Sequence, residues 1–562
     1  MNIKVKSGPV LSAILIAILT FSFTTAAVAA NPPCGCNIIQ DTTLEADMTC
    51  EGTAITIGAD NIVLDCAGRS ITGTGIGSGI FLSGRTGVTI KNCVVTKFSN
   101  GINLASSSKN ILTSNTVSSN YNGIYLTTSS NYNTLTGNTA SGNTGGFGIF
   151  ESTNNTLDGN IASNNMTGIG LVYLSNDNNI TNNKITASGT IGTFGILFTT
   201  GSNRNTINKN TINYNTSTPN PGIVGIKVSC DGNVKYGGSS DNTITDNTIT
   251  MNQLNLSKWS QGIRIVQRSN NNKILNNNIT VNGGANPSAN PNVTASIRIA
   301  SSSNNRIMDN NLTTNNLITI GSSGYGVYLS EGLSAGLDDD YWSEGSNYNT
   351  VSGNTITAVD NSGVGIRLDL SSNNTLTSNN INANNYGVSL DASSNNNILT
   401  GNTVNSSFAP SINLASSSGN TIYRNNIIGT FLPKVSSDAA VELSYGGSGN
   451  FWDRTTEPYF VVGVDSNRPD VKDSYPYSAL NGWPPPAPPA NYEPITGNPE
   501  VDAAMGVLNN KYTDPETGLA THGTYVSAVT NKIVEMRMAG KITKEQGGEI
   551  VKKAAQSSVN MP

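Results

Sequence analysis

The sequence is poor in the residues on which many active sites and charged interfaces depend. Its 562 residues include one histidine, His522, four tryptophans and only 12% charged side chains. Because His522 follows a proline-rich stretch near the C-terminus, a Ser-His-Asp or Cys-His catalytic set is excluded for the rest of the chain. The net charge of -5 disfavours binding through bulk positive charge, so we expect no nucleic-acid partner. Beyond the N-terminus no apolar run reaches 18 residues, which excludes a multi-pass membrane protein.

The N-terminus has the pattern of a signal peptide. Residues 1–30 begin with Lys4 and Lys6, continue through an apolar stretch and end in small residues. Cleavage predicts a secreted, cell-surface or periplasmic chain with no transmembrane segment and a net charge near -7; an uncleaved anchor is the alternative. Export permits disulfides, and the candidates are Cys34, Cys36, Cys50, Cys66 and Cys93, with their pairing left open.

Asparagine is the residue in excess, at 82 of 562 positions. Asparagine tolerates the left-handed backbone conformation of a sharp corner, and like amides that stack at a regular spacing can hydrogen-bond to one another. We therefore assign the excess to structure. Glycan attachment at the many Asn-x-Ser/Thr triplets is the alternative.

A short motif repeats along the middle of the chain: Gly, Ile or Val, any residue, then an apolar residue. It begins at Gly79, Gly101, Gly123, Gly168, Gly195, Gly225, Gly262, Gly326, Gly365 and Gly387, with looser copies at Gly148, Ser296 and Ser411. A second motif of the NTLTGNTAS type follows it, and the tightest copies are 22 residues apart. A fixed minimum spacing with variable insertions indicates a solenoid.

Both motifs alternate apolar and polar residues over a few positions, which is the pattern of short strands with one buried face. Asparagine, glycine and serine stand at the bends between them. One such repeat cannot bury a core by itself and must stack on its neighbours. The sequence therefore predicts an all-β fold: a parallel β-helix of about 13 or more rungs, where a rung is one turn of the helix.

At this point the chain resembles a known family. The stretch Thr43 to Gly73, the stretch Gly87 to Ile102 and the NTI-x-x-NTI rungs resemble right-handed parallel β-helix repeat proteins with the pectin-lyase-like fold, and NosD-like periplasmic copper-binding proteins in particular. The resemblance extends over residues 40–480. It implies the fold, which hosts lyases, hydrolases, epimerases, adhesins and maturation factors. Copper fits the rod poorly, because the rod has no histidine and few methionines.

The chain divides into six segments on these patterns. After the signal peptide we expect an N-terminal cap at 31–52, the β-helix at 53–432, a C-terminal cap at 433–482, a proline-rich linker at 483–498 and a small α-helical module at 499–562. The cap resembles the closing segment of NosD-like chains. Its oxygen-bearing residues are calcium candidates, with an ordinary polar cap as the alternative: Asp465, Asn467, Asp470 and Asp473. The helical module is a candidate contact for a cell-surface partner.

Strand alternation makes the third residue of each repeat point away from the core. Along the chain these residues are Phe81, Asn103, Tyr125, Phe150, Gly170, Leu197, Lys227, Arg264, Arg298, Tyr328, Arg367, Ser389 and Asn413. Four cations and a tyrosine thus occupy five consecutive rungs and predict a solvent-facing basic stripe beside the longest insertions. The predicted ligand-binding residues are Lys227, Arg264, Arg298, Tyr328, Arg367 and Trp342.

Carboxylates flank this stripe, and the pattern is compatible with three functions. Asp369 and Asp391 follow two positions after the stripe, and with Arg367 they are the candidate catalytic residues. Binding of an acidic polysaccharide is the primary hypothesis. A polysaccharide lyase or glycoside hydrolase is the second, and an adhesin or envelope protein without enzymatic activity is the third. Apart from calcium, no cofactor is expected.

Overall fold

The computed structural model describes most of the region predicted as the rod and its caps. The described residues are 31–189, 193–216, 222–230, 237–253, 258–283, 293–316, 324–331, 344–358, 360, 362–429, 435–437, 441–443, 450–452, 460–461 and 471–472. The predicted signal peptide, the linker and the helical module lie outside them. No helix of the described residues is long and apolar enough to cross a membrane.

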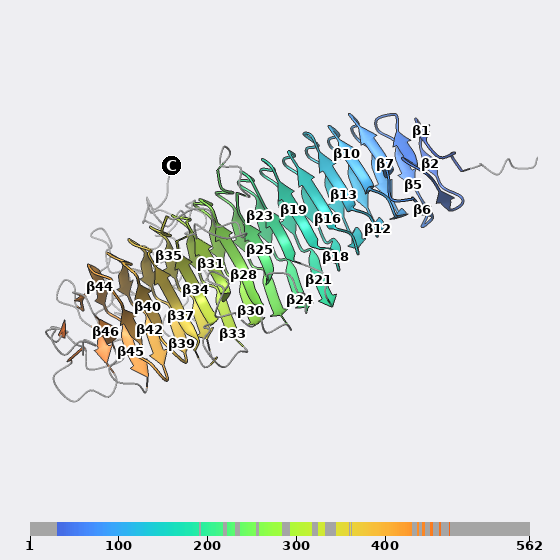
Figure 1. Cartoon of the computed structure of the whole chain (residues 1–562). Coiled ribbons are helices and arrows are strands. Elements are labelled where there is room, and N and C mark those ends of the chain that lie inside the picture. Colours follow the sequence, from blue (N-terminus) through green and yellow to red (C-terminus); the bar gives the residue numbers. More distant parts are fainter. Residues whose placement is uncertain are drawn as a thin grey trace, which may run out of the picture.

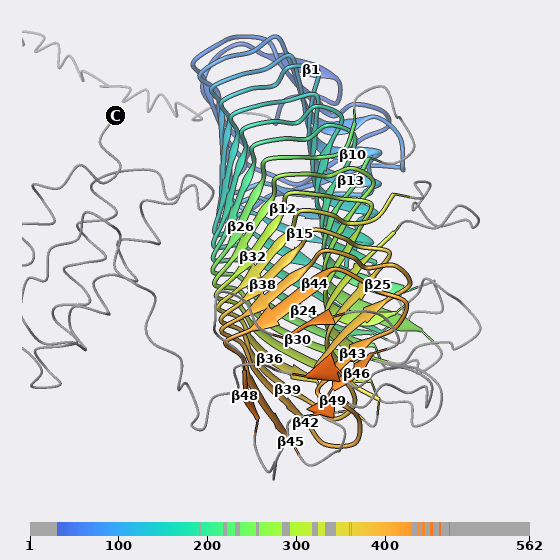
Figure 2. The same ribbon diagram turned by 90° about the vertical axis from the view of Figure 1, so that its left-hand side faces the viewer.

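The described chain forms a right-handed parallel β-helix of sixteen rungs, which appears in Figure 1 as one continuous rod. Each rung contributes one strand to each of three parallel sheets, A, B and C. Figure 2 shows the rungs stacked in sequence order from the blue end of the chain to the orange end. The predicted fold is therefore confirmed, and no helix occurs among the described residues.

The strands of sheet A are β1 (Cys36–Ile38), β4 (Ile55–Ile57), β7 (Ser78–Ser83), β10 (Asn100–Ala105), β13 (Asn122–Thr127), β16 (Gly145–Phe150), β19 (Thr167–Val172), β22 (Phe194–Phe198), β25 (Gly222–Val228), β28 (Trp259–Val266), β31 (Thr294–Ala300), β34 (Gly324–Ser330), β37 (Val364–Asp369), β40 (Val388–Asp391), β43 (Ile412–Leu414) and β46 (Val435–Ser437). The strands of sheet B are β2 (Thr42–Thr43), β5 (Val63–Asp65), β8 (Thr89–Lys91), β11 (Ile111–Thr113), β14 (Thr134–Thr136), β17 (Thr156–Asp158), β20 (Asn179–Thr181), β23 (Thr206–Asn208), β26 (Thr243–Thr245), β29 (Lys273–Leu275), β32 (Arg306–Met308), β35 (Thr350–Ser352), β38 (Thr375–Thr377), β41 (Ile398–Thr400), β44 (Asn420–Tyr423) and β47 (Val441–Glu442). The strands of sheet C are β3 (Met48–Thr49), β6 (Ser70–Thr72), β9 (Val94–Thr96), β12 (Thr116–Ser118), β15 (Thr139–Ser141), β18 (Ile161–Ser163), β21 (Lys184–Gly189), β24 (Thr211–Thr216), β27 (Thr248–Gln253), β30 (Asn278–Gly283), β33 (Asn311–Asn316), β36 (Thr355–Ala358), β39 (Asn380–Ala383), β42 (Thr403–Ser406), β45 (Asn426–Gly429) and β48 (Phe451–Trp452). Strands β49 (Phe460–Val461) and β50 (Val471–Lys472) form a separate antiparallel pair.

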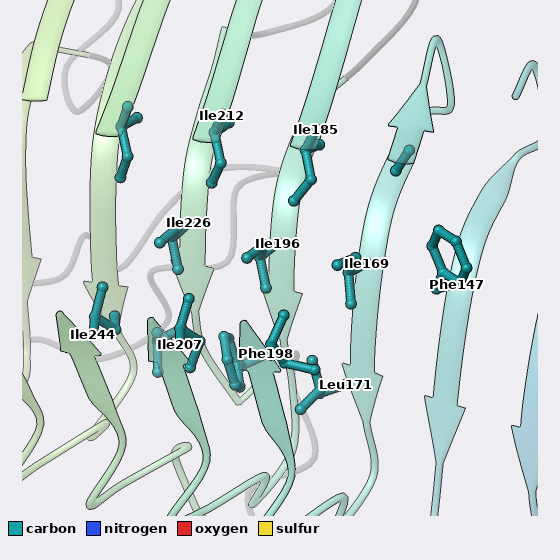
Figure 3. Packing of buried hydrophobic residues seen from close by; sticks show 14 of the residues in the cluster. Phe147, Ile169, Leu171, Ile185, Ile196, Phe198, Ile207, Ile212, Ile226 and Ile244 are labelled. Atoms are coloured by element: carbon teal, nitrogen blue, oxygen red, sulfur yellow. The ribbon is translucent and has the colours of Figure 1, made fainter. Parts of the chain in front are cut away.

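One aliphatic core runs along the axis of the rod. Inward positions of successive strands stack in register, so like side chains lie over like side chains. Figure 3 shows one such row in sheet A, made by Phe147, Ile169, Ile196 and Ile226 on four consecutive rungs. Because every inward side chain packs against the rungs before and after it, no rung is stable alone.

The glycine of the repeated motif is required by space inside the helix. A Cβ atom on Gly225 would lie 2.5 Å from the carbonyl oxygen of Gly262 in the next rung and 2.7 Å from Ile249 Cγ2 of sheet C. Gly225 therefore stands where sheet A bends towards sheet C, with backbone and side chain on both sides. Any larger residue there would have to displace core atoms.

Three ladders of buried asparagines close the corners of the rod. One lies between sheets A and B from Asn110 to Asn420, and one lies between sheets B and C from Asn115 to Asn450. Within the described ranges, a third ladder between sheets C and A is formed by Asn120, Asn143 and Asn165. In a typical step, the backbone N–H and Nδ2 of Asn115 both donate to Oδ1 of Asn138, at 3.0 and 2.9 Å. The amides thus satisfy buried backbone groups at the corners, as the asparagine excess predicts.

The left-handed corner residue directly precedes each ladder asparagine. Lys109, Ser114 and Ser119 have φ values of 58°, 56° and 55°. The left-handed backbone conformation and the stacked amide therefore belong to two adjacent positions. The first position accepts several residue types, and the second is the asparagine of the ladder.

Two disulfides lie at the N-terminal end of the rod. Cys34 is bonded to Cys50, and Cys66 to Cys93, whereas Cys36 and Cys230 take part in no disulfide. The segment expected to cap the rod supplies β1, β2 and β3, which form the first rung in register with the second. The Cys34–Cys50 bond therefore closes the terminal rung on itself.

The rungs are not all alike. We call rungs 3–6, from β7 to β18, the uniform rungs, and rungs 7–12, from β19 to β36, the expanded rungs. Sheet C strands have three residues in the uniform rungs and six in β21, β24, β27, β30 and β33. Within the described part of the chain the third ladder extends to Asn165, and this lengthening begins in the next strand of sheet C. Sheet C is therefore broader in the expanded rungs than in the uniform rungs.

Candidate functional site

The predicted stripe residues occupy one register position on the outer side of sheet A. Lys227 pairs with Arg264, Arg264 with Arg298, Arg298 with Tyr328, and Tyr328 with Arg367. We call this position the outer column; its members from β7 to β43 are Phe81, Asn103, Tyr125, Gly148, Gly170, Leu197, Lys227, Arg264, Arg298, Tyr328, Arg367, Ser389 and Asn413. Four cations and a tyrosine therefore do lie on five consecutive rungs.

The prediction that these side chains face solvent is wrong for most of them. Lys227, Arg264 and Arg298 are only 2%, 3% and 1% exposed, and Tyr328 is also buried. Each cation packs near an aromatic ring of the same face: Lys227 at 5.3 Å from the Phe194 ring centre, Arg264 at 5.4 Å from that of Trp259, and Arg298 at 6.0 Å from that of Tyr328. Alternation decides only that a residue points away from the core, and neighbouring side chains decide whether water reaches it.

One member of the predicted stripe was also misplaced. Phe147, not Ile149, is the inward partner of Ile124, so Gly148 occupies the outer column where Phe150 was expected. The repeat in this rung is Gly146-Phe147-Gly148-Ile149, two residues earlier than the sequence motif suggested. Two glycine motifs overlap in this stretch, and the pairing between strands selects the first of them.

Arg367 is the accessible member of the five predicted stripe residues, and it stands in a cluster of polar side chains. The Arg367 side chain is 30% exposed, and the side chains of Asp369 and Asp391 are 25% and 19% exposed. Arg367 Nε lies 3.1 Å from Asp391 Oδ2, and Nη2 lies 3.4 Å from Asp369 Oδ2. The structure thus brings together the three predicted catalytic residues, and one guanidinium spans both carboxylates.

Tyrosines cover the other side of this guanidinium. Tyr325 and Tyr328 stack with ring centres 4.8 Å apart, and Arg367 lies 5.7 and 5.8 Å from the two centres. Arg367 Nη1 donates a hydrogen bond to Tyr325 Oη at 3.1 Å, while Tyr328 Oη donates to Asp369 Oδ2 at 3.2 Å. Five side chains from β34 and β37 to β40 therefore hold one another in place.

Three members of this neighbourhood were not predicted from the sequence. Tyr325 was missed because strict alternation places it and Tyr328 on opposite sides, whereas the two rings stack together outside the main aliphatic core. Ser389 Oγ donates to Asp391 Oδ1 and Oδ2 at 3.1 Å, and Asn413 Nδ2 donates to Asp391 Oδ1 at 3.1 Å. Both had been placed in the column, and the signal for their role was their register beside Arg367.

Burial changes the acidity of the groups in the cluster. Burial raises the pKa of Asp391, and the opposing charge of Arg367 and the hydrogen bond from Ser389 offset only part of that rise. The pKa of Glu331, which follows β34, is raised by burial and by the charge of Asp369. Burial also places the pKa of the Tyr328 hydroxyl well above its ordinary value. Tyr328 therefore stays a hydrogen-bond donor at neutral pH.

Several predicted residues lie outside the described part of the chain. These are Trp342 and the calcium candidates Asp465, Asn467, Asp470 and Asp473. Within the described ranges, no group of three or more histidine, cysteine, aspartate or glutamate side chains is arranged to hold a metal ion.

Comparison with known proteins identifies the chain. The family model described as "Periplasmic copper-binding protein (NosD)" matches residues 35–226 and 333–459, which is more than half of the chain. The chain belongs to the NosD family. The unmatched stretch between the two parts contains Lys227, Arg264, Arg298 and Tyr328, whereas Arg367, Asp369 and Asp391 lie in the matched part. The outer column therefore combines positions inside and outside the family match.

Three solved structures of the same general architecture are distant in sequence. The periplasmic alginate epimerase AlgG is 15% identical, with a TM-score of 0.35 over 58% of this chain and 75% of that one. The A-module of the Azotobacter vinelandii mannuronan C-5 epimerase AlgE6 is 13% identical, with a TM-score of 0.40 over 74% of this chain and 90% of that one. PfbA, a surface adhesin of Streptococcus pneumoniae, is 16% identical, with a TM-score of 0.37 over 68% and 85%. No curated protein matches the chain.

The copper in the family description finds no suitable ligands in the described residues of this NosD-family chain. Its one histidine, His522, is outside them, and four of its six cysteines form disulfides. Cys36 and Cys230, which take part in no disulfide, stand on rung 1 and after β25 on rung 9, and Met48 and Met251 are buried in the aliphatic core. Soft copper ligands are thus scattered along the described rod rather than gathered at one place.

Proposed function

We propose that this NosD-family protein is exported and binds an acidic polysaccharide at the outer face of sheet A, with Arg367 as the point of contact. The observation that carries the proposal is the in-register run of Lys227, Arg264, Arg298, Tyr328 and Arg367, which ends in a partly exposed guanidinium. A run of cations at the strand spacing of about 4.8 Å favours a polymer with regularly spaced negative charges over a single small anion.

The cluster around Arg367 suits a sugar that bears both hydroxyl and carboxylate groups. Two carboxylates and two tyrosines hold the guanidinium plane, so little side-chain entropy is lost when a ligand binds. A uronate-type carboxylate can take a place beside Arg367, and Asp369 and Asp391 can accept hydrogen bonds from sugar hydroxyls. The buried cations contribute positive potential and need not touch the ligand.

The test is Arg367→Gln, measured by titration calorimetry against a panel of acidic and neutral polysaccharides. Loss of one partly exposed charge should weaken binding of the acidic ligand about tenfold. Arg204→Gln is the matched control, because Arg204 is an exposed arginine paired with Asp177 away from the outer column. Equal affinity of the parent and Arg367→Gln for every acidic ligand would refute the proposal.

Acid–base cleavage of the same polymer is a second candidate, favoured by the raised pKa of Asp391 beside a second carboxylate. Here Asp391 would supply a proton to the leaving oxygen, and the enzyme would be a lyase or glycoside hydrolase. Asp391→Asn and Asp369→Asn should then abolish the release of reducing ends or unsaturated products while binding survives. If the parent protein releases no such products, the cleavage proposal is refuted. Binding without catalysis, as in an adhesin or envelope protein, is then the function that remains.

Other parts of the proposal rest on segments outside the described residues. We place the protein in the periplasm or at the cell surface, supported by the signal-peptide pattern, the two disulfides and the periplasmic description of the family. Calcium at Asp465, Asn467, Asp470 and Asp473, and a cell-surface partner for the module at 499–562, remain part of the proposal and are tested by calcium titration and by deletion of the module.

A further inference from the structure

A hollow lies in the outer column where two consecutive rungs carry glycine. Gly148 pairs with Tyr125 on one side and with Gly170 on the other, and Gly170 pairs with Leu197. Every other rung from β7 to β43 carries a side chain at this position. The missing side chains leave an open depression of about 280 Å³, about two strand spacings long, which we call the glycine hollow.

The two glycines are explained by space and not by backbone conformation, since neither has a positive φ. A Cβ atom on Gly148 would lie 2.6 Å from Tyr125 Cδ2, so the Tyr125 ring lies across this glycine. Around Gly170 the nearest atoms to such a Cβ are Val172 Cγ2 at 3.8 Å and Thr167 Cγ2 at 3.9 Å, which leaves room for a side chain. Gly148 therefore leaves space for the Tyr125 ring to pack over the strand. Gly170 leaves the surface beside that ring without a covering side chain.

Aromatic side chains form the walls of the hollow. Tyr125 and Phe150 border it, and the Phe150 ring is held by Tyr173, with ring centres 5.3 Å apart. Tyr121 and Met166 stand at its edge and are 64% and 45% exposed. Exposure of two large apolar side chains beside two aromatic walls is a feature of binding surfaces.

The polar groups of the hollow are uncharged. Asn122, Thr144 and Thr167 line it together with the aromatic residues, and none of the residues that line it is charged. An anionic ligand has no partner among these residues, and the nearby charge of Glu151, which acts on Tyr125, would repel it. A purely apolar chain would make no hydrogen bond to these amide and hydroxyl groups and would itself stay open to water.

We propose that the glycine hollow binds a neutral pyranose ring of a glycan, with the C–H face of the sugar on Tyr125 and Phe150 and its hydroxyl groups towards Asn122, Thr144 and Thr167. A pyranose combines an apolar face with a rim of hydroxyl groups, which matches aromatic walls with an uncharged polar edge. Leu197 lines the hollow and pairs with Lys227, so the next position of the same column belongs to the predicted basic stripe. The site uses no residue of the Arg367 cluster, so it is independent of the proposed function.

The test is Gly170→Leu in the full-length chain. This change fills the hollow with the residue that the next rung already carries in the column, and there is space for its Cβ. Calorimetric titration with neutral hexasaccharides of glucose, mannose and N-acetylglucosamine should show affinity for at least one of them in the parent. We expect at least a tenfold loss in Gly170→Leu and a similar loss in Tyr125→Ala.

Phe81→Ala is the matched control, because Phe81 is an aromatic member of the same column two rungs before Tyr125. It should leave binding unchanged, as should Arg367→Gln, which affects only the acidic ligand. If Gly170→Leu unfolds at lower urea than the parent, Tyr125→Ala and Phe150→Leu decide in its place. The proposal is overturned if the parent binds no neutral hexasaccharide, if the filled hollow binds as well as the open one, or if phenylalanine peptides bind in the hollow and sugars do not.

Discussion

The uniform and expanded rungs differ in their loops and share their ladders. Successive asparagines of the ladder between sheets A and B are 22 or 23 residues apart from Asn110 to Asn178, and 27 to 44 residues apart from Asn178 to Asn349. Both kinds of step make the same pair of hydrogen bonds to Oδ1. The rise of each rung is thus set by strand pairing and amide stacking, whatever the length of the connection.

The difference shows where such a rod can change without losing its register. Among the residues that the structure describes, the third ladder, between sheets C and A, extends to Asn165, and the next strand of sheet C is longer. The extended strands bury Ala187, Tyr214 and Met251 in place of the amides. The other two ladders continue through these rungs. The sheet A strands that carry Lys227, Arg264 and Arg298 are longer than those of the uniform rungs.

The largest effect that separates the two regions should come from Asn143→Ala in the third ladder. Its Oδ1 accepts from the backbone N–H and Nδ2 of Asn120, and its Nδ2 donates to Val117 O and Asn165 Oδ1. Loss of the amide leaves buried groups without partners, so urea unfolding should show about 4 kcal/mol less stability. The exposed strand residue Asn213, changed to threonine, is the control and should cost under about 0.5 kcal/mol.

Removal of the Cys66–Cys93 disulfide should have the next largest effect. The bond closes a segment with a sequence separation of 27 at the end of the rod that carries the uniform rungs. The double change to serine should reduce the free energy of unfolding by about 3 kcal/mol, since the unfolded chain is then less constrained. Cys36→Ser, at a free thiol of the same region, is the comparison, and an equal loss in both would argue against a stabilising cross-link.

A smaller effect in the expanded rungs is expected from Tyr214→Phe. The buried Tyr214 hydroxyl donates to the carbonyl oxygen of Phe194 at 2.6 Å and bridges sheets C and A in a rung beyond Asn165. Its loss should cost about 1–2 kcal/mol in urea unfolding. An unchanged midpoint of urea unfolding would mean that apolar packing alone stabilises the contact between sheets C and A in these rungs.

The smallest effect is a difference in pH dependence between two carboxylates that lie outside these regions, Asp65 on β5 and Asp391 on β40. Hydrogen bonds from Asn92 and the Ala67 N–H, followed by Lys91, lower the pKa of Asp65, so its contribution to stability is present above the unfolded pKa near 4 and is lost as the pH falls. Burial raises the pKa of Asp391, so it has the opposite sign and lowers stability as the pH rises through the interval above 4. Asp65→Asn should reduce the difference in unfolding free energy between pH 7 and pH 3. An unaltered pH profile would contradict a stabilising role for the Asp65 carboxylate.

The sequence was sufficient for the fold and its repeat. Period-two alternation, glycine at a fixed place and an asparagine excess allow only stacked short strands, because each of these features meets a local requirement of every rung. The same regularity predicted which residues share the outer column from Lys227 to Arg367. It failed at Phe150, because two overlapping glycine motifs fit the local pattern equally well and only the pairing of β13 with β16 chooses Gly148.

Tertiary structure alone decided exposure, partners and shape. Arg264 and Arg298 alternate outward as predicted and are still buried, each beside an aromatic ring of the same strand or of the next one. The contact of Arg367 with Asp369, Asp391 and Tyr325 joins residues up to 42 positions apart, a separation set by loops whose length no local rule constrains. The glycine hollow exists for the same reason, since a glycine becomes a binding surface only when the adjacent rung also lacks a side chain.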